Sequence, residues 1–123
     1  YGGNPLACKV AKAALEVVVD ENLAKKSQVL GDLFRKELTD FMGTQEMVQT
    51  VRGKGLLNAL VINDTAESTT AWDLCVVLKE NGLLAKPTHG NIIRFAPPLV
   101  ITEDELSHCL EIIKQTITDF NFG

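Results

Sequence analysis

The sequence has few aromatic residues, no long hydrophobic run and no cluster of basic residues. Its 123 residues include one Trp, one Tyr and five Phe, and the longest run of Lys or Arg is the pair Lys25-Lys26. With a formal net charge of −4, it lacks the basic surface that is typical of nucleic-acid-binding domains. No uncharged stretch approaches the roughly 20 residues that span a bilayer, and no basic-then-apolar signal opens the chain. We therefore expect a soluble protein that does not bind nucleic acid.

Cysteine is also scarce, with single residues at Cys8, Cys75 and Cys109. An odd number of widely spaced cysteines cannot form a closed disulfide framework, and no pair has the CxxC spacing of a zinc site. Each cysteine lies in an apolar helical pattern, where a free thiol behaves as a small hydrophobic side chain. The pattern predicts buried thiols, a reducing intracellular compartment and no metal site.

Hydrophobic periodicity predicts one α+β domain. Apolar residues recur every three or four positions, as in amphipathic helices, within residues 5–20, 23–41, 71–80 and 103–120. Short apolar or β-branched runs predict strands at residues 47–52, 56–62, 83–86 and 92–95. This order predicts an antiparallel or mixed sheet of about four strands covered by helices. We expect residues 53–55 to connect the first two strands, and the last two strands to form a hairpin.

Local signals mark the ends of the predicted helices. Asn4 can cap the first helix, and Pro5 suits the first helical position because the free N–H there needs no partner. Gly82 provides the left-handed residue that commonly ends a helix. Thr102 and Glu105 have the spacing of a capping box, which predicts the start of the last helix.

Burial is predicted for three further features. The first helix carries a stripe formed by Ala7, Val10, Ala11, Ala14, Val17 and Val18, which we expect to be buried, against a part outside this chain if the helix is a connector. The strand at residues 56–62 is nearly continuous in apolar residues, as expected of a strand buried on both faces. Trp72 is expected to anchor the packing of the third helix.

Arg94 is the main candidate for a binding residue. Alternation along its strand places Ile93 and Phe95 on one face and Ile92 and Arg94 on the other. Arginine is rarely buried without a partner, and its planar guanidinium matches a carboxylate with two hydrogen bonds. Two interpretations remain open at this point: an anion site, or an edge-strand Arg whose head reaches solvent or pairs with a surface Glu.

Two glycine-containing segments were considered as anion sites. Gly2 and Gly3 precede a helix N-terminus, whose free N–H groups and dipole suit an anion such as phosphate. Gly53-Lys54-Gly55 lacks the spacing of a phosphate-binding loop, and we interpret it as a tight strand connection with an exposed Lys.

Three other polar residues lie near the predicted hairpin or on the last helix. Lys86 and His89 are positioned to border a pocket beside Arg94, or to lie free in solvent. His108 falls on the polar face of the last helix, where we expect it to be solvated. Neither histidine has a partner at metal-ligand or catalytic-triad spacing.

Four segments together resemble a known family. They are YGGNPL at residues 1–6, VRGKGLLN at 51–58, NGLLAKPTHG at 81–90 and IIRFAPPL at 92–99. They resemble the C-terminal part of the class III pyridoxal-phosphate-dependent aminotransferases, and the similarity runs over essentially the whole chain. Residues 81–99 are most similar to the ornithine aminotransferase branch of that family.

The resemblance implies a fold-type I enzyme that forms a homodimer. Such an enzyme transfers the δ-amino group of L-ornithine to 2-oxoglutarate, giving glutamate 5-semialdehyde and glutamate, in arginine metabolism and proline biosynthesis. Pyridoxal 5'-phosphate carries the amino group. In the family, the Schiff-base lysine, the aspartate at the pyridine nitrogen and the stacking aromatic all precede this segment. The resemblance therefore implies that the chain contains no catalytic residue and is inactive alone.

The resemblance also assigns roles to three positions and divides the chain. Arg94 matches the arginine that binds the α-carboxylate of 2-oxoglutarate or glutamate and that pairs with a large-domain glutamate while ornithine is bound. Tyr1 and Gly2 match the stretch beside the cofactor phosphate of the partner subunit. Residues 1–20 are expected to form a connector helix to a missing large domain, and residues 21–123 a C-terminal small domain.

Alternatives from other functional classes stay open on the sequence alone. The chain could be a free-standing α+β module that holds a carboxylate metabolite through Arg94, or a dimerisation module without catalysis. A related diamine or an acyl-ornithine could replace ornithine as substrate. Members of the family occur in the mitochondrial matrix and in the cytosol, and the sequence does not decide between these two compartments.

Overall fold

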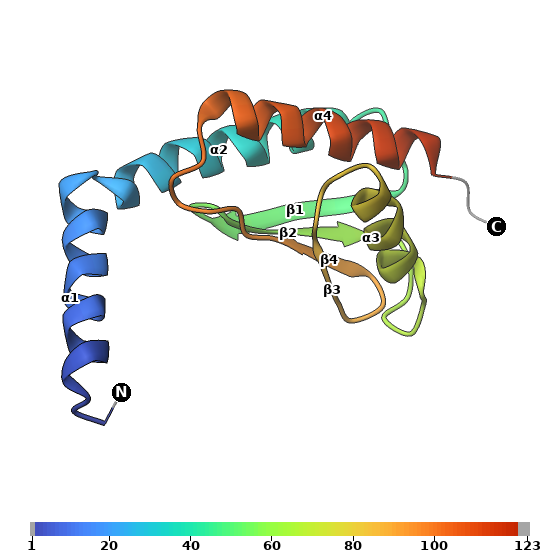
Figure 1. The fold of residues 1–123 in the computed structure, drawn as a ribbon. Coiled ribbons are helices and arrows are strands. Elements are labelled where there is room, and N and C mark those ends of the chain that lie inside the picture. Colours follow the sequence, from blue (N-terminus) through green and yellow to red (C-terminus); the bar gives the residue numbers. More distant parts are fainter. Residues whose placement is uncertain (1, 121–123) are drawn as a thin grey trace.

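The computed structural model describes residues 2–120 and shows an α+β fold (Figure 1). Its elements are α1 (Pro5–Asp20), α2 (Leu23–Met42), β1 (Val48–Lys54), β2 (Leu57–Ile62), α3 (Thr70–Glu80), β3 (Lys86–Thr88), β4 (Ile92–Phe95) and α4 (Glu103–Asp119). The strands form one sheet in the order β1-β2-β4-β3, and every neighbouring pair is antiparallel. The predicted fold class is confirmed, in its antiparallel form.

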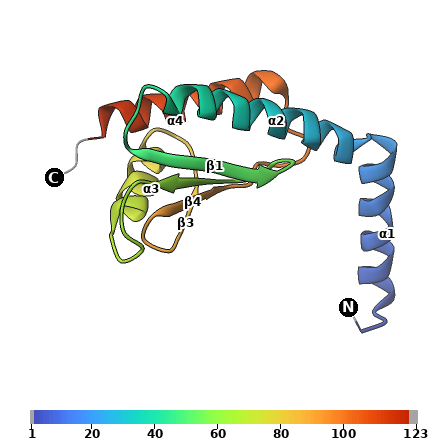
Figure 2. The same ribbon diagram turned by 180° about the vertical axis from the view of Figure 1, so that it is seen from behind.

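Helices cover one face of this sheet. In Figures 1 and 2, α2 and α4 run side by side across the sheet, and α3 lies at the end away from α1. Alternation along the strands sends every second side chain into this layer. The core joins residues of the sheet to the inner faces of three helices: Leu60, Ile62, Ile93, Phe95, Leu30, Phe34, Leu38, Leu74, Leu78, Leu106, Leu110 and Ile113. The opposite face of the sheet is not covered by a helix.

The helix ends follow the signals in the sequence. The Asn4 side chain accepts hydrogen bonds from the backbone N–H groups of Leu6 and Ala7, at 3.0 and 3.1 Å. At α4 the capping box is complete, since Thr102 and Glu105 each accept a hydrogen bond from the other's backbone N–H. Gly82 has φ +90°, a conformation that glycine adopts without steric cost. The predicted ends of these three helices are confirmed.

A close backbone contact positions the connection between β1 and β2. An added Cβ at Gly31 in α2 would lie 1.9 Å from the carbonyl oxygen of Gly55, so only glycine fits there. Arg35, one turn along α2, donates to the same carbonyl at 2.9 Å and to the buried side chain of Asn58 at 2.6 Å. The guanidinium therefore satisfies polar atoms that would otherwise lie unpaired beside the core.

The prediction that the apolar stripe of α1 is buried is wrong within this chain. None of the residues Pro5–Asp20 is buried, and Val10 is 61% exposed. Cys8 is exposed as well, contrary to the prediction for the three thiols, whereas Cys75 is buried and Cys109 is half-buried. The reason is visible in Figures 1 and 2, where α1 stands apart from the sheet and meets only the start of α2.

Three local predictions also need correction. The third strand occupies Lys86–Thr88 rather than residues 83–86, because Leu83 packs into the core while Leu84 is 83% exposed. The second strand is not buried on both faces along its whole length, since Leu57 is 58% exposed. Trp72 is 62% exposed and does not anchor α3, whose packing comes from Leu74 and Leu78.

Candidate functional site

Arg94 lies on the uncovered face of the sheet. Its neighbours Ile93 and Phe95 are buried on the helix-covered side, so the strand alternation turns the Arg94 side chain the other way, as predicted. Strand β4 lies between β2 and β3. The interpretation of Arg94 as an edge-strand residue is therefore wrong, because its strand is paired on both sides.

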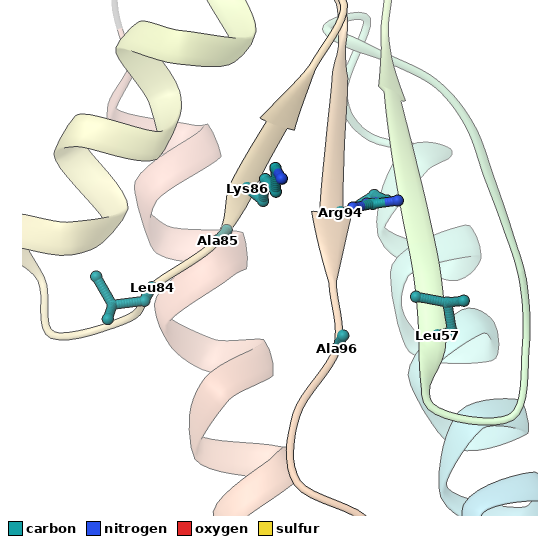
Figure 3. A pocket seen from close by; sticks show the side chains of 6 residues that line it. All are labelled: Leu57, Leu84, Ala85, Lys86, Arg94 and Ala96. Carbon is teal, nitrogen blue, oxygen red and sulfur yellow. The ribbon is translucent and has the colours of Figure 1, made fainter. Parts of the chain in front are cut away.

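The register of the sheet places a second cation beside Arg94. Lys86 of β3 is the direct cross-strand partner of Arg94, and Ala59 of β2 is its partner on the other side. A pocket of about 390 Å³ lies here, lined by Leu57, Leu84, Ala85, Lys86, Arg94 and Ala96 (Figure 3). Figure 3 shows both cations on the same side of the strands.

The two cations have no protein counter-ion among residues 2–120. The ion pairs within residues 2–120 all lie elsewhere: Lys12–Glu16, Arg35–Asp32, Lys36–Asp40, His108–Glu111 and Lys114–Glu37. The four strands contain neither Asp nor Glu. Lys86 and Arg94 are both exposed, and two like charges directly opposite each other repel across a sheet, so an anion bound between them would stabilise the pair. A guanidinium without a partner can bind a carboxylate through two parallel hydrogen bonds.

The other candidate residues do not join this pocket. His89 occupies the turn between β3 and β4 with φ +57° and is not among the residues that line the pocket. His108 is exposed on α4, beside Glu111, as expected for a solvated residue. Gly55 turns the chain between β1 and β2 with φ +55°, so the connection is tight as predicted, but it occupies residues 55–56, because Gly53 and Lys54 still pair with β2.

The start of the chain offers no cradle for a ligand. Tyr1 lies outside the described residues. Gly2 and Gly3 are exposed, and a Cβ added to either would meet no atom within 4 Å. Their predicted place beside a cofactor phosphate stays a prediction.

Cys75 and Cys109 are packing residues, whereas Cys8 is exposed. Burial raises the pKa of the Cys75 thiol to about 11, so that the reactive thiolate is scarce at neutral pH. Burial, and to a smaller degree the charge of Glu105, raise the pKa of Cys109. Within residues 2–120, no three His, Cys, Asp or Glu side chains are grouped so that they could hold a metal ion. In the same range, no helix is long and apolar enough to cross a membrane.

Comparison with known proteins decides the family. The family model described as "Aminotransferase class-III" matches residues 1–117. The chain belongs to the class-III aminotransferases. It is 58% identical over 120 residues to the ornithine aminotransferase of Emericella nidulans. The match covers 97% of this chain and 26% of that protein. It is 55% identical to the mitochondrial ornithine aminotransferase of Rattus norvegicus, over 98% of this chain and 27% of that protein.

Solved structures of this family have the same fold. The acetylornithine aminotransferase of Elizabethkingia anophelis matches 96% of this chain with a TM-score of 0.93 and 62% identity, over 29% of its own length. The ornithine aminotransferase of Plasmodium yoelii matches 97% with a TM-score of 0.88 and 39% identity, over 31% of its own length. The chain thus spans between a quarter and a third of the relatives that it matches, and it corresponds to an α+β small domain.

Class-III aminotransferases use pyridoxal phosphate. The cofactor requires a phosphate cradle, a partner for its pyridine nitrogen and a lysine for covalent attachment. The exposed Gly2 and Gly3 supply no cradle, and the Arg94 pocket contains two cations but no acid that could face a pyridine nitrogen. Residues 2–120 therefore do not fit the cofactor by themselves, whereas they fit a substrate carboxylate.

Proposed function

We propose that the chain is the C-terminal small-domain part of an aminotransferase that transfers the δ-amino group of L-ornithine to 2-oxoglutarate. The products are glutamate 5-semialdehyde and glutamate. The proposal is supported by relatives named ornithine aminotransferase at 55% identity and above over nearly the whole chain. The acetylornithine aminotransferase among the similar structures makes acyl-ornithine the principal competing substrate.

In this proposal Arg94 binds the α-carboxylate of 2-oxoglutarate or glutamate. The single observation that carries it is the guanidinium on the uncovered face of the sheet, which lies beside Lys86 and has no ion-pair partner among residues 2–120. A guanidinium donates two parallel hydrogen bonds to one carboxylate, which fixes the orientation of the substrate as well as its position. The rigid central strand holds the arginine backbone, so little order is lost when the substrate binds.

Residues 1–20 are proposed to connect this small domain to a large domain, with residues 21–123 forming the small domain itself. Support comes from α1, which exposes its apolar residues and extends on the side of the uncovered sheet face (Figures 1 and 2). A large domain placed on this side would cover the α1 stripe and close the Arg94 pocket. Tyr1 and Gly2 are proposed to lie near the cofactor phosphate of the partner subunit in a homodimer.

Pyridoxal phosphate, when bound to the complete protein, supplies the electron sink for amino-group transfer. Its attachment lysine is proposed to lie in the large domain, so the 123-residue chain alone is expected to be inactive. What this chain contributes is recognition of the substrate carboxylate. Relatives from Rattus norvegicus and Drosophila melanogaster are named mitochondrial, whereas those from Emericella nidulans and Saccharomyces cerevisiae are not, so both compartments stay open for the complete enzyme.

The proposal is tested by Arg94→Ala in the full-length enzyme, with each half-reaction followed separately in single turnovers. We expect the half-reaction with 2-oxoglutarate to slow by about 30-fold or more, because loss of a desolvated charged contact costs on the order of 2–5 kcal/mol. The half-reaction with ornithine should change much less. Arg94→Lys keeps the charge but loses the planar fork, and it should restore activity only in part.

Three other outcomes would contradict the proposal. Equal losses in both half-reactions would make Arg94 a structural residue, and no loss in either would leave it a solvated side chain. Binding of 2-oxoglutarate by the isolated 123-residue chain, with an affinity equal to that of the full-length protein, would favour a free-standing carboxylate-binding module.

A further inference from the structure

The uncovered face of the sheet carries a row of cations that the sequence pattern alone does not show. Cross-strand partners share a face, and the register links Arg52 to Ala59, Ala59 to Arg94, and Arg94 to Lys86. One row therefore crosses all four strands with three cations and one alanine. The chain as a whole has a formal net charge of −4, so this positive row is a local feature and does not reflect the composition.

Within this row, Arg94 and Lys86 form the closest cationic pair. Direct partners in an antiparallel sheet have Cβ atoms about 4.5–5.5 Å apart, whereas Arg52 is separated from Arg94 by a whole strand. Both Arg94 and Lys86 line the same pocket. Neither side chain has a hydrogen bond or ion pair to another residue in the described range, so both heads are available to a ligand.

We propose that Lys86 is a second carboxylate-binding residue of the Arg94 pocket. This inference rests on the proposed function and adds a residue to it. The planar guanidinium of Arg94 orients one carboxylate through two hydrogen bonds. The ammonium group of Lys86, on a flexible side chain, adds a second positive charge that can adjust its position to the bound anion. Two cations beside one pocket favour a substrate with two carboxylates, such as 2-oxoglutarate or glutamate, over a substrate with a net positive charge.

A different role for Lys86 follows from its place in the sheet. Strand β3 is an edge strand, and lysine on an edge strand discourages pairing with another chain. That role predicts self-association when Lys86 is replaced, without a change in substrate binding. A carboxylate-binding role predicts weaker 2-oxoglutarate binding without self-association, so one variant separates the two.

The experiment compares Lys86→Met with Lys86→Arg in the full-length enzyme, in single-turnover half-reactions at low ionic strength. We expect Lys86→Met to raise the apparent Kd for 2-oxoglutarate by about 3- to 10-fold while the limiting rate changes less than 2-fold. Lys86→Arg should stay within 2-fold of the wild type. Because salt screens the interaction, the difference between wild type and Lys86→Met should shrink in 0.5 M NaCl.

Lys54→Met is the matched control. Lys54 lies in the outer strand β1 opposite Leu57, and it does not line the Arg94 pocket. The same change of charge there should alter the apparent Kd less than 2-fold. An equal loss in both lysine variants would overturn the inference, because it would show a general effect of surface charge.

The inference and the proposed function fail in different ways. If Arg94→Ala impairs the 2-oxoglutarate half-reaction but Lys86→Met leaves its Kd unchanged, the role of Lys86 is overturned and the proposed function stands. If Arg94→Ala spares that half-reaction, the proposed function itself fails. Lys86→Gln repeats the test without an added apolar group, and light scattering of both variants detects self-association.

Discussion

Helices α1 and α4 are both amphipathic, yet the apolar stripe of α4 is buried and that of α1 is exposed. In α4, Leu106 and Ile113 are each 1% exposed, whereas in the stripe of α1 Val10 is 61% and Val17 is 45% exposed. The α4 stripe packs on the sheet beside α2, while α1 extends away from both (Figure 1). The difference teaches that an apolar stripe marks a surface suited to burial, but not the element that buries it.

The same contrast divides the two faces of the sheet. One face is apolar and covered by helices, and the other carries Arg52, Arg94 and Lys86 and is uncovered. Helix α1 extends on the side of the uncovered face, and its apolar residues are exposed. A large domain and a bound carboxylate together would cover these apolar residues and neutralise the cations, which is the arrangement proposed above.

The largest expected effect separates a buried leucine of α2 from an exposed leucine of α1. Leu38 is fully buried, so Leu38→Ala should lower the free energy of unfolding by about 2–5 kcal/mol. Leu15→Ala should change it by less than about 0.5 kcal/mol in the 123-residue chain. Urea denaturation of both variants measures the difference, and equal losses would show that α1 packs on the body of the domain.

A glycine pair gives the next largest effect. Alanine normally stabilises a helix interior relative to glycine by about 1 kcal/mol, but at Gly31 its Cβ would lie 1.9 Å from the Gly55 carbonyl oxygen. We expect Gly31→Ala to destabilise the chain by about 1–3 kcal/mol.

Gly43→Ala, at the end of the same helix, is the control. The nearest atom to a Cβ added there would be the Asp40 carbonyl oxygen at 3.4 Å, so the change in the free energy of unfolding should be below about 1 kcal/mol. Thermal or urea unfolding tests the pair. A stabilising Gly31→Ala would show that α2 does not approach the β1–β2 connection this closely.

Removing a helix cap should affect α1 and α4 differently, with a difference in the free energy of unfolding of about 1 kcal/mol. Thr102→Ala removes the capping box of α4 and should lower the global free energy of unfolding by about 1 kcal/mol. Asn4→Ala removes the corresponding cap of α1, but α1 has no buried residue. Hydrogen exchange should therefore speed up in α1 alone, without a shift in global unfolding. A global loss equal to that of Thr102→Ala would contradict the comparison.

The smallest expected effect is a pH dependence of the free energy of unfolding, which comes from carboxylates outside α1. Lys114 Nζ lies 2.7 Å from Glu37 Oε2. The hydrogen bond from Lys114 and its positive charge hold the pKa of Glu37 below the ordinary value of 4.5. The hydroxyl of Thr70 and the N–H of Thr65 likewise lower the pKa of Asp64. A lowered carboxyl pKa contributes stability above the unfolded value, and this contribution is lost as the pH falls through the folded value.

Urea midpoints measured between pH 6 and pH 3 test this direction. We expect the midpoint to fall as the pH drops below about 4.5. Glu37→Gln should make that fall shallower, whereas Glu16→Gln on exposed α1 serves as the control. An acid-side slope that is unchanged in Glu37→Gln would show that the Glu37–Lys114 pair does not contribute.

Much of the fold could be predicted because local chemistry decides it. The caps at Asn4 and Thr102 and the left-handed Gly82 depend on neighbours within a few residues, and all three are as predicted. The third strand was displaced because Leu83 and Leu84 both suit a strand, and only tertiary packing places one in the core and the other in solvent. The burial of α1 failed for the same reason, since periodicity carries no information about the partner.

The site could be predicted only in part. Alternation along β4 identified the face of Arg94, and Lys86 was named as a nearby cation. The order of the strands and their register were needed to show that Arg94 lies in a central strand with Lys86 and Ala59 directly beside it. Leu57, Leu84 and Ala96 complete the pocket, and no sequence pattern marks them as lining residues because they come from separate elements.

The most direct test of the central claim is a crystal structure of the full-length protein with 2-oxoglutarate or glutamate bound. The account predicts a carboxylate hydrogen-bonded to both terminal nitrogens of Arg94 at about 3 Å, on the uncovered face of the sheet and facing a large domain that also covers α1. A bound substrate whose carboxylates are held entirely by other residues, with Arg94 pointing to solvent, would contradict it.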